Sequence, residues 1–419
     1  MSLRLAGSLA AAFAALMMVG ASSDVLAQQA PAAPASAQKG PPAVNPAIPP
    51  TWAQGRPKNM ENSTLAPHPP GLKALDAKDI PTGKLKAPPG FKVELWASGI
   101  PNARSMARGD KGTIFVGNRF IGKVFAVVDK GGSREVKVVA EGMHRPNGIA
   151  FKNGALYVAE ISKVNRFDDI ESKLDNPPKP VVVYDDLPKD EPHGWKFIAF
   201  GPDGRLYVPV GQPCNTCEPP PTHGHIRSIT ADGKDAKIMA IGVRNTVGFD
   251  WHPVTKEMWF TDNGRDWLGE NLPQDELNRV SGPQQHFGNP YCLGGDTLDP
   301  VLGKGKKCAD YVAPEVKLGP HVAALGMRFY TGNMFPAEYK NRAFIALHGS
   351  WNRTQITGYK IMQVTLQADG KHKYEPFVEG WLDGGKFWGR PADVMVMPDG
   401  ALLISDDVAG AIFRVSYSK

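Results

Sequence analysis

The sequence lacks a long apolar run beyond residue 20, and it lacks any block of basic residues. The first absence leaves no later segment of the length that a membrane-spanning helix needs, so we expect a chain that does not span a membrane. The second argues against a nucleic-acid partner, because the net charge of +6 is small for 419 residues and both signs are interspersed. No convincing amphipathic helix stands out either, whereas 45 Gly and 38 Pro favour a fold with many turns.

Cysteine is scarce, with four residues, Cys214, Cys217, Cys292 and Cys308. An even number in an exported chain favours two disulfides, paired Cys214–Cys217 and Cys292–Cys308 as sequence neighbours. Covalent haem would need a histidine after Cys217, where Glu218 stands, so this possibility is excluded. A zinc site that uses the nearby His223 and His225, or a redox-active pair, are the alternatives to a structural disulfide at Cys-Asn-Thr-Cys.

The N-terminus has the pattern of a secretory signal. A short basic start precedes an apolar run from Leu5 to about Gly20 and a small-x-small exit at Val25-Leu26-Ala27, which predicts removal of residues 1–27. A membrane anchor is the alternative, but Gly and Ser interrupt the run and no basic flank follows it. We therefore expect an exported protein of a bacterial periplasm. Residues 28–70 are rich in Ala, Pro, Gln and Ser and are predicted to form a disordered linker, which leaves 71–419 for the folded domain.

One short pattern recurs in that domain: an apolar strand, a turn of Gly, Pro, Asp or Asn, and a second strand. Clear copies cover residues 148–158, 197–208, 247–260 and 393–404, and weaker copies lie at 106–116 and 327–345. Asp-Gly and Asn-Gly at the turn supply the positive φ that a tight hairpin needs. A third strand pattern follows each copy, beginning near residues 122, 163, 224, 275, 358 and 410.

These six units predict an all-β fold, a six-bladed β-propeller. The alternating segment from Phe91 to Ala97 precedes the first unit, and we expect it to complete the last blade and close the ring. A pair of β-sandwiches is the competing architecture, but six copies of one pattern argue against it.

Propeller sites form from loops at one end of the central channel. Polar residues just before the first strand of a repeat should converge there, and they are Arg145, His193, Arg244, Asn245 and Arg390. His223 and His225 begin an outer strand, where structural or solvent-facing roles are expected. The aromatic cluster Trp381, Phe387 and Trp388 is expected to pack within a blade or at the channel rim, with stacking on a cofactor or sugar as the alternative.

At this point the residues resemble a known family. The run from Ile241-Gly-Val-Arg-Asn-Thr-Val-Gly-Phe through Met258-Trp-Phe-Thr-Asp-Asn-Gly to Asp275-Glu-Leu-Asn and His286-Phe-Gly-Asn-Pro is similar to the soluble glucose and sorbosone dehydrogenases that use pyrroloquinoline quinone (PQQ). The resemblance covers nearly all of residues 90–419. Gly349-Ser-Trp-Asn-Arg is more similar to the sorbosone-type branch.

The resemblance implies roles for matching positions. His193 matches the base that takes the proton of the sugar C1 hydroxyl as hydride leaves C1 for the quinone. Arg244 matches the cation beside the quinone oxygen that becomes an oxyanion, and Asn245 matches a hydrogen-bond partner of the cofactor. Arg390 matches a cation that pairs with the cofactor's carboxylates.

The resemblance also implies Ca²⁺ beneath the cofactor, held partly by main-chain carbonyl groups at the positions of Gly264 and Arg265. Asp275 and Glu276 are further candidate ligands.

Three positions depart from the pattern of the glucose enzymes. Pro192 stands where an Asp usually orients the base, and Ala392 replaces a second cofactor-binding Arg. The Lys that pairs with the cofactor has no clear counterpart; Asn352 and Arg353 are nearest, and Arg145 is a further cation.

The implied function is oxidation of an aldose or a sorbosone-type sugar at C1, with electrons passed to an external quinone or cytochrome. Two alternatives remain from the residues themselves. A metal-dependent propeller lactonase would need convergent Glu, Asp and Asn side chains, and a non-catalytic propeller would bind carbohydrate or protein without a cofactor. Substrate specificity is expected from the insertions at 160–192, 212–224 and 289–322.

Overall fold

The computed structural model describes residues 50–418. The predicted signal, 1–27, and residues 28–49 of the predicted linker lie outside the described residues. No helix within the described part of the chain is both long and apolar enough to cross a membrane.

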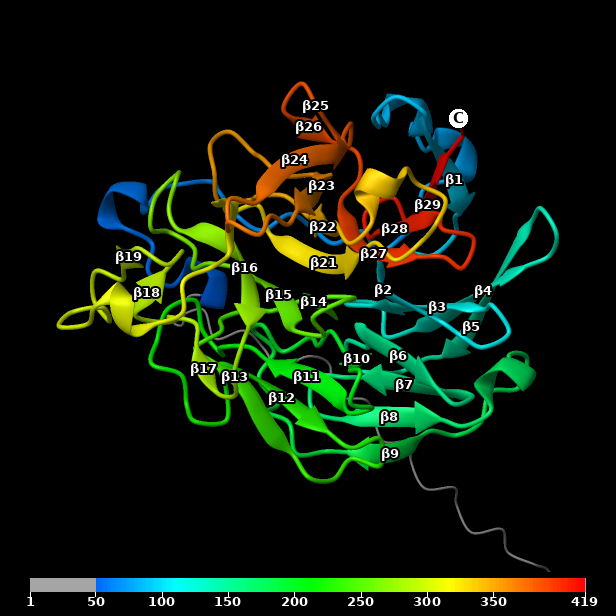
Figure 1. Cartoon of the computed structure of the whole chain (residues 1–419), viewed down its shortest axis with the longest axis horizontal. Coiled ribbons are helices and arrows are strands. Elements are labelled where there is room, and N and C mark those ends of the chain that lie inside the picture. Colours follow the sequence, from blue (N-terminus) through cyan, green and yellow to red (C-terminus); the bar gives the residue numbers. More distant parts are fainter. Residues whose placement is uncertain (1–49, 419) are drawn as a thin grey trace, which may run out of the picture. The chain divides into compact units, whose positions relative to one another are not determined.

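The described strands build a six-bladed β-propeller with one blade for each predicted repeat (Figure 1). Blade 1 contains β2 (Ala103–Arg108), β3 (Ile114–Asn118), β4 (Val124–Asp129) and β5 (Arg134–Ala140). Blade 2 contains β6 (Gly148–Lys152), β7 (Ala155–Ala159), β8 (Val164–Phe167) and β9 (Val181–Tyr184). Blade 3 contains β10 (Ala199–Phe200), β11 (Leu206–Val210), β12 (His225–Ile229), β13 (Lys237–Ile241) and a short parallel strand, β17 (Gln285–His286).

The second half of the chain repeats the arrangement. Blade 4 contains β14 (Gly248–Trp251), β15 (Met258–Asp262), β16 (Gln274–Val280) and β20 (Val316–Pro320). Blade 5 contains β21 (Ala324–Phe329), β22 (Ala343–Leu347), β23 (Lys360–Thr365) and β24 (Lys373–Val378). Blade 6 contains β27 (Pro391–Val396), β28 (Leu402–Asp406), β29 (Ala411–Tyr417) and β1 (Phe91–Ala97).

The remaining elements are short and lie in the connections. Two small hairpins are β18 (Cys292–Leu293) with β19 (Thr297–Leu298), and β25 (Leu382–Asp383) with β26 (Lys386–Phe387). The 3-10 turns are η1 (Thr51–Ala53), η2 (Lys58–Met60), η3 (Ala77–Asp79), η4 (Thr82–Lys84), η5 (Ile170–Ser172), η6 (Cys308–Asp310) and η7 (Ala337–Tyr339).

Ring closure follows the prediction. β1 pairs antiparallel with β29, from Phe91 opposite Tyr417 to Leu95 opposite Phe413, so the first strand of the domain completes the last blade. Figure 1 shows blue β1 beside red β29. The blade that holds both ends of the domain is therefore fastened by main-chain hydrogen bonds, which leaves no gap between the first and last repeats.

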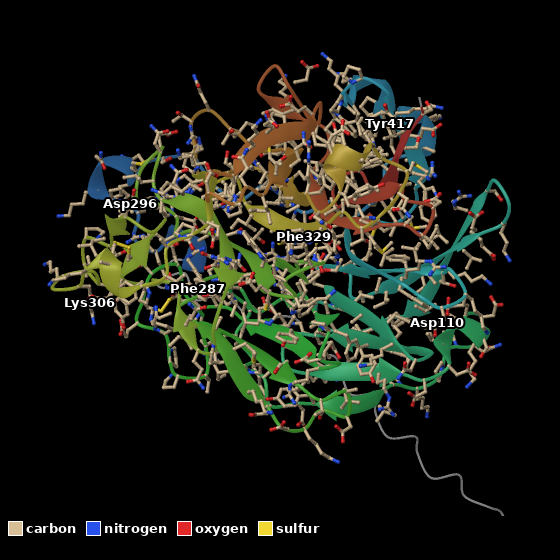
Figure 2. The ribbon with its side chains drawn as sticks, viewed as in Figure 1. Asp110, Phe287, Asp296, Lys306, Phe329 and Tyr417 are labelled. Carbon is tan, nitrogen blue, oxygen red and sulfur yellow. A yellow bond between two sulfur atoms is a disulfide. The ribbon has the colours of Figure 1, made fainter. Side chains whose placement is uncertain are left out.

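The core consists of six apolar clusters, one between each pair of neighbouring blades. β3 shows how one strand serves two of them: Ile114 and Val116 pack toward blade 6, whereas Phe115 packs toward blade 2. Side chains that alternate along a strand thus bury both faces of a blade, which explains why the middle strands read as continuous apolar runs. Figure 2 shows Phe329 in the interior, while Asp296 and Lys306 lie at the periphery.

The outermost strands are the elements that the repeat pattern did not predict. β5, β9 and β24 contain many exposed or half-buried residues, because each is the edge strand of its blade. β13 is similarly exposed, although the short strand β17 pairs with its end. Their weak periodicity hid them among the connections. Both predicted disulfides are present, Cys214–Cys217 and Cys292–Cys308.

Residues 50–70, which the sequence assigns to the linker, contact the propeller. Trp52 hydrogen-bonds to the loop after β15, and Gln54 hydrogen-bonds to the loop before β12. His68 hydrogen-bonds to the loop after β22.

Candidate active site

A cavity lies where the innermost strands of all six blades begin. It has a volume of about 410 Å³, within the usual range of small-molecule sites. Each blade contributes one residue at or just before the start of its inner strand. In blade order these residues are Arg104, Arg145, His193, Arg244, Ala323 and Arg390. The structure therefore brings together the five residues that the sequence placed before inner strands, since Asn245 also lines this cavity.

His193 lies in the loop between β9 and β10 with a left-handed backbone, φ 50°. Its Nδ1 lies 2.7 Å from the carbonyl oxygen of Gln212. A carbonyl can only accept, so Nδ1 carries the hydrogen and Nε2 keeps a free lone pair. The main chain of Gln212 thus orients the imidazole in place of the acidic residue that Pro192 replaces. Gly211 is required beside it, because a Cβ there would lie 2.6 Å from the Cβ of His193.

The surroundings of His193 keep its ring neutral. Burial lowers its pKa well below 6.5, and the positive charge of Arg244 lowers it further, against the smaller opposing effect of the Gln212 carbonyl. A neutral imidazole with a free Nε2 can accept a proton from a bound hydroxyl group.

Arg244 is almost completely buried and held by five donor contacts. Its main-chain N–H donates to Asp262 Oδ2 at 2.8 Å, and its guanidinium donates to Asn215 O, Asn215 Oδ1, Asn263 O and Asp266 Oδ2. The main-chain N–H of Asn245 donates to the other oxygen of Asp262 at 2.7 Å. One carboxylate after strand β15 therefore sets the turn that presents both residues to the cavity.

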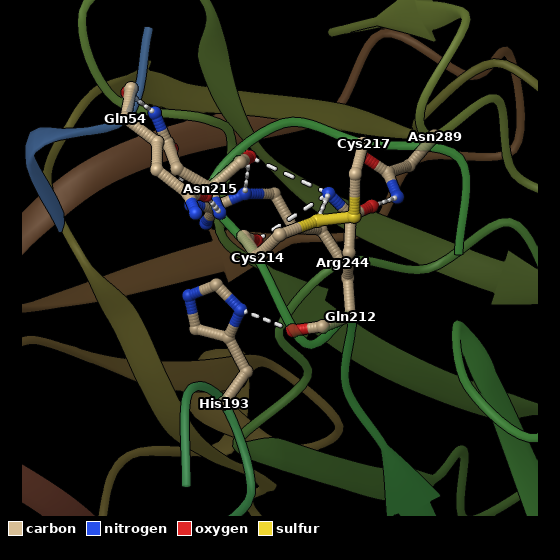
Figure 3. Close-up of a disulfide and its surroundings, with 8 residues drawn as sticks. All are labelled: Gln54, His193, Gln212, Cys214, Asn215, Cys217, Arg244 and Asn289. Atoms are coloured by element: carbon tan, nitrogen blue, oxygen red, sulfur yellow. Dashed lines mark hydrogen bonds between the residues drawn. A yellow bond between two sulfur atoms is a disulfide. The ribbon is translucent and has the colours of Figure 1, made fainter. Parts of the chain in front are cut away.

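The Cys214–Cys217 loop lies next to both His193 and Arg244 (Figure 3). Gln212, which orients His193, donates from Nε2 to Cys214 Sγ at 3.0 Å and accepts from Asn289 at 2.6 Å. Asn215 accepts from Arg244 Nη2 at 2.9 Å on the other side. The disulfide thus closes the loop that positions both His193 and Arg244, which is a structural role and leaves no metal or haem role for this pair.

Arg390 enters the cavity from the start of β27. Its Nε donates to His348 O at 2.9 Å and its Nη2 to Gly349 O at 2.7 Å. Its guanidinium is held by carbonyl oxygens rather than by a carboxylate, so its charge is available to an anion in the cavity. Ala392 is buried in the core between blades 3 and 4, and its side chain packs there.

Two further arginines, Arg104 and Arg119, line the cavity and were not identified from the sequence. Arg104 pairs with Asp407 at 3.0 Å, as Arg145 pairs with Glu191. Arg119 belongs to no ion pair of the described chain, and its buried Nε has no hydrogen-bond partner there. Its guanidinium carbon lies 3.3 Å from the ring centroid of Trp195.

A simple signal could have found Arg119 and other residues of the lining. In an antiparallel hairpin the second strand ends where the first begins, so residues after the second strand reach the same channel end. Arg119 follows β3, Asn263 follows β15, and Asp407 follows β28. The prediction from the sequence covers only the residues before the first strand of each repeat.

The structure separates the remaining candidates. Asn352 lines the cavity and donates to Asp266 Oδ1 at 3.0 Å. Arg353 is absent from the cavity lining; its Nε donates to Gln355 O at 3.1 Å and its Nη1 donates to Glu270 O. The geometry does not support the prediction that Arg353 binds the cofactor, because its guanidinium contacts carbonyl groups of surface loops.

The histidine pair and the aromatic cluster both lie off the cavity. His223 pairs with Asp190 at 3.2 Å, and His225 Nε2 accepts from Arg227 at 3.0 Å. Trp381 is completely buried in the core between blades 5 and 6, with Phe387 and Trp388 packed against the same core. These residues therefore have structural roles here.

The residues proposed for calcium offer main-chain oxygen atoms rather than a cluster of acidic side chains. Gly264 lines the cavity, and within the described chain the carbonyl oxygens of Gly264 and Arg265 accept no hydrogen bond. The side chain of Arg265 is engaged elsewhere, in a buried ion pair with Asp299 at 2.6 Å. Residues 50–418 contain no group of three His, Cys, Asp or Glu side chains arranged to hold a metal. Free carbonyl groups fit a hard cation that shares its remaining ligands with an anionic molecule.

Comparisons with known proteins agree with this geometry. Residues 161–414, more than half of the chain, match the family described as Glucose / Sorbosone dehydrogenase. An uncharacterized protein of Borreliella burgdorferi is 36% identical over 364 residues, which cover 82% of this chain and 94% of that relative. A pyrroloquinoline quinone-dependent pyranose dehydrogenase of Coprinopsis cinerea is 30% identical over 127 residues, or 26% of this chain and 17% of that relative.

Among solved structures, the calcium structure of a Trichoderma reesei carbohydrate-active enzyme of family AA12 superimposes with a TM-score of 0.67. The match covers 80% of this chain and 97% of that one at 19% identity. At this identity the likeness establishes a shared fold.

Proposed function

This chain belongs to the glucose/sorbosone dehydrogenase family, and from that premise we propose that it is a PQQ-dependent sugar dehydrogenase. The proposed substrate is an aldose or a sorbosone-type sugar oxidised at C1. Electrons would pass to an external quinone or cytochrome, because the sequence carries no covalent haem motif.

The observation that carries the proposal is the charge of the cavity. Five arginines line it, and Arg119 among them has a buried Nε without a partner in the described chain. Arg119 is half-buried, and a partly desolvated cation without a partner is stabilised when an anion binds beside it. Asp407, Glu191 and Asp266 each pair with one of the other arginines, which leaves Arg119 and Arg390 without a carboxylate partner in the described chain. A flat cofactor with several carboxylates would pair with these two, whereas a neutral sugar would not. Trp195 offers an aromatic face next to Arg119.

Each residue around the cavity has a part in the proposed reaction. When bound, the quinone would supply the acceptor for one hydride from the sugar, that is, two electrons and one proton. His193 Nε2 would accept the proton of the reacting hydroxyl group, since Nδ1–H is committed to Gln212. Arg244 would stabilise negative charge that develops on an oxygen atom beside it.

Binding of the cofactor is assigned to the remaining polar residues. Arg119, Arg390 and Arg145 would pair with carboxylates, and Asn245 and Asn352 would donate or accept hydrogen bonds. The carbonyl groups of Gly264 and Arg265 would hold Ca²⁺, which polarises and organises an anionic ligand. In this assignment, Arg119 takes the part of the lysine that pairs with the cofactor in the glucose enzymes, and Arg353 does not bind the cofactor.

One experiment tests this function. The purified protein is loaded with PQQ and CaCl₂, cofactor binding is followed by fluorescence, and dye reduction is assayed over aldoses, sorbosone and lactones. We expect His193→Ala to keep PQQ binding and lose dye reduction by at least a hundredfold, the usual contribution of a general base. We expect Arg119→Gln to weaken PQQ binding about tenfold or more, with Arg353→Gln as the matched control that binds PQQ normally.

Other results would point elsewhere. Lactone hydrolysis without quinone would identify a metal-dependent lactonase, and sugar binding without turnover would identify a binding propeller. Equal PQQ affinity in Arg119→Gln and the wild type would contradict the assignment of Arg119.

We also propose export to a periplasm, with residues 1–27 removed and residues 71–419 forming the propeller. The signal pattern at the N-terminus and the two disulfides support this location, because such bonds persist in oxidising compartments.

A further inference from the structure

Residues 50–71, called the strap here, form one wall of the cavity. Thr51 and Trp52 line it near one end of the strap, and the segment from Pro67 to Gly71 lines it near the other. The same cavity holds His193, Arg244 and Arg390, so a segment from outside the six repeats faces the reacting centre.

The first end of the strap is attached beside blades 3 and 4. Trp267 Nε1 donates to Trp52 O at 2.6 Å. Asn215 donates from its main-chain N–H to Gln54 Oε1 at 3.1 Å and from Nδ2 to Gln54 O at 2.6 Å. Asn215 is also the residue that holds Arg244, so the strap is tied directly to the functional residues.

The second end is attached beside blades 5 and 6. His68 Nε2 lies 3.1 Å from Ser350 O and 2.9 Å from the hydroxyl oxygen of Tyr359. Gly71 passes so close to blade 6 that a Cβ there would lie 2.5 Å from the carbonyl oxygen of Asp407. A side chain at position 71 would displace the strap, which explains glycine at this point.

The strap is stiff between its attachments. Arg56 folds it on itself by donating to Ser63 O at 3.4 Å and Leu65 O at 3.1 Å. Three prolines at positions 67, 69 and 70 restrict the second half to an extended backbone. The strap is therefore pre-ordered, so it loses little conformational entropy when a ligand binds.

The strap also brings an aromatic ring to the cavity. Trp52 meets Trp351 edge to face, with ring centroids 5.8 Å apart, and Trp351 meets Trp267 at 5.5 Å. The guanidinium of Arg56 lies over Trp267 at 4.5 Å and braces this cluster. Trp52 and Trp351 are half-buried, and both residues line the cavity. Indole rings offer a large, rigid apolar surface at low entropic cost.

We propose that the strap is part of the substrate site and that Trp52, with Trp351, binds the apolar C–H face of a neutral sugar ring. The arginines of the cavity suit an anionic ligand. The two tryptophans are uncharged and suit the neutral sugar. The proposal deepens the proposed function and rests on it for the choice of a sugar as the ligand.

The test measures binding separately from turnover. The probe is 1,5-anhydro-D-glucitol, which lacks the C1 hydroxyl group and cannot be oxidised there; its dissociation constant is measured by calorimetry on the full exported chain, with and without PQQ and Ca²⁺. We expect Trp52→Ala to weaken binding of this probe about tenfold, equivalent to about 1.4 kcal/mol, while PQQ affinity stays unchanged. Trp52→Phe keeps an aromatic face and should bind within about threefold of the wild type.

Two further variants guard against loss of folding. Trp96→Ala removes a tryptophan of β1 that is not part of the cavity lining and should leave probe binding unchanged. Arg56→Ala loosens the strap but keeps both rings, and we expect weaker probe binding with an unchanged melting temperature of the propeller.

The outcomes separate the two proposals. Wild-type affinity for the probe in Trp52→Ala overturns the strap proposal, even if the enzyme oxidises sugars, and so does a wild-type protein that binds no probe. Probe binding that depends on Trp52, in a protein that reduces no dye with any sugar, supports the strap and overturns the dehydrogenase.

Discussion

At the scale of single residues, the orientation and protonation state of His193 depend on the residues around it. The Gln212 carbonyl orients the ring, Gly211 leaves room for it, and Arg244 disfavours its protonation. In the proposed reaction, His193 would need no proton release before it acts as the base, because its ring is already neutral.

The pH dependence of the reaction follows from this environment. Because the pKa of His193 lies well below 6.5, we expect kcat/KM to stay constant as the pH falls through 6.5 and to decline only at lower pH. Arg244→Gln removes a nearby positive charge, so the acid limb of its residual activity should move to higher pH. A wild-type midpoint at or above pH 6.5 would contradict this assignment.

Arg119 is the residue that sequence reasoning missed and that the structure makes most informative. It follows the second strand of one of the two weaker repeats, at 106–116, where the strand pattern is hard to recognise. Only the folded chain places its guanidinium against Trp195 and leaves its Nε without a partner among the described residues.

At the scale of elements, the Cys214–Cys217 loop connects residues from separate blades. It holds Gln212 on one side and Asn215 on the other, and through them His193 and Arg244 (Figure 3). The loop is short, so its covalent closure contributes little chain entropy and its main effect is positional.

The two disulfides should therefore separate stability from activity. In the chain-entropy model, closing the short Cys214–Cys217 loop is worth about 2 kcal/mol and closing the Cys292–Cys308 loop about 3 kcal/mol. We expect Cys214→Ser with Cys217→Ser to lower kcat/KM at least tenfold, because Gln212 and Asn215 lose their support. Cys292→Ser with Cys308→Ser is the matched pair, and it should lose more stability in urea but less kcat/KM. The reverse order would show that the shorter disulfide does not position the site.

At the scale of the whole molecule, closure of the ring depends on β1. Phe91 contacts four aromatic rings, those of Phe335, Tyr339, Phe377 and Tyr417, with centroids 4.8 to 5.1 Å away. These rings belong to blades 5 and 6 and their connections, so one side chain joins the last two blades to the first strand.

Removal of this side chain should weaken the closure without altering the cavity. We expect Phe91→Ala to lower the free energy of unfolding by about 3 kcal/mol, measured by urea denaturation, with kcat/KM at 25 °C unchanged. Lys92→Ala, an exposed neighbour that makes only a surface ion pair with Glu94, should change stability by less than about 0.5 kcal/mol. Equal stability of the two variants would contradict the role of Phe91 in closure.

The sequence by itself determined the repeated architecture, the closing strand, both disulfides and the residues before each inner strand. These features depend on local chemistry: alternating side chains, turn residues and sequence neighbours. Tertiary structure alone decided that Arg353 lies outside the cavity lining, that the Gln212 carbonyl orients His193, and that residues 50–70 wall the site. Such contacts join residues far apart in the chain, and no periodicity records them, because their positions follow from how six blades close around one channel.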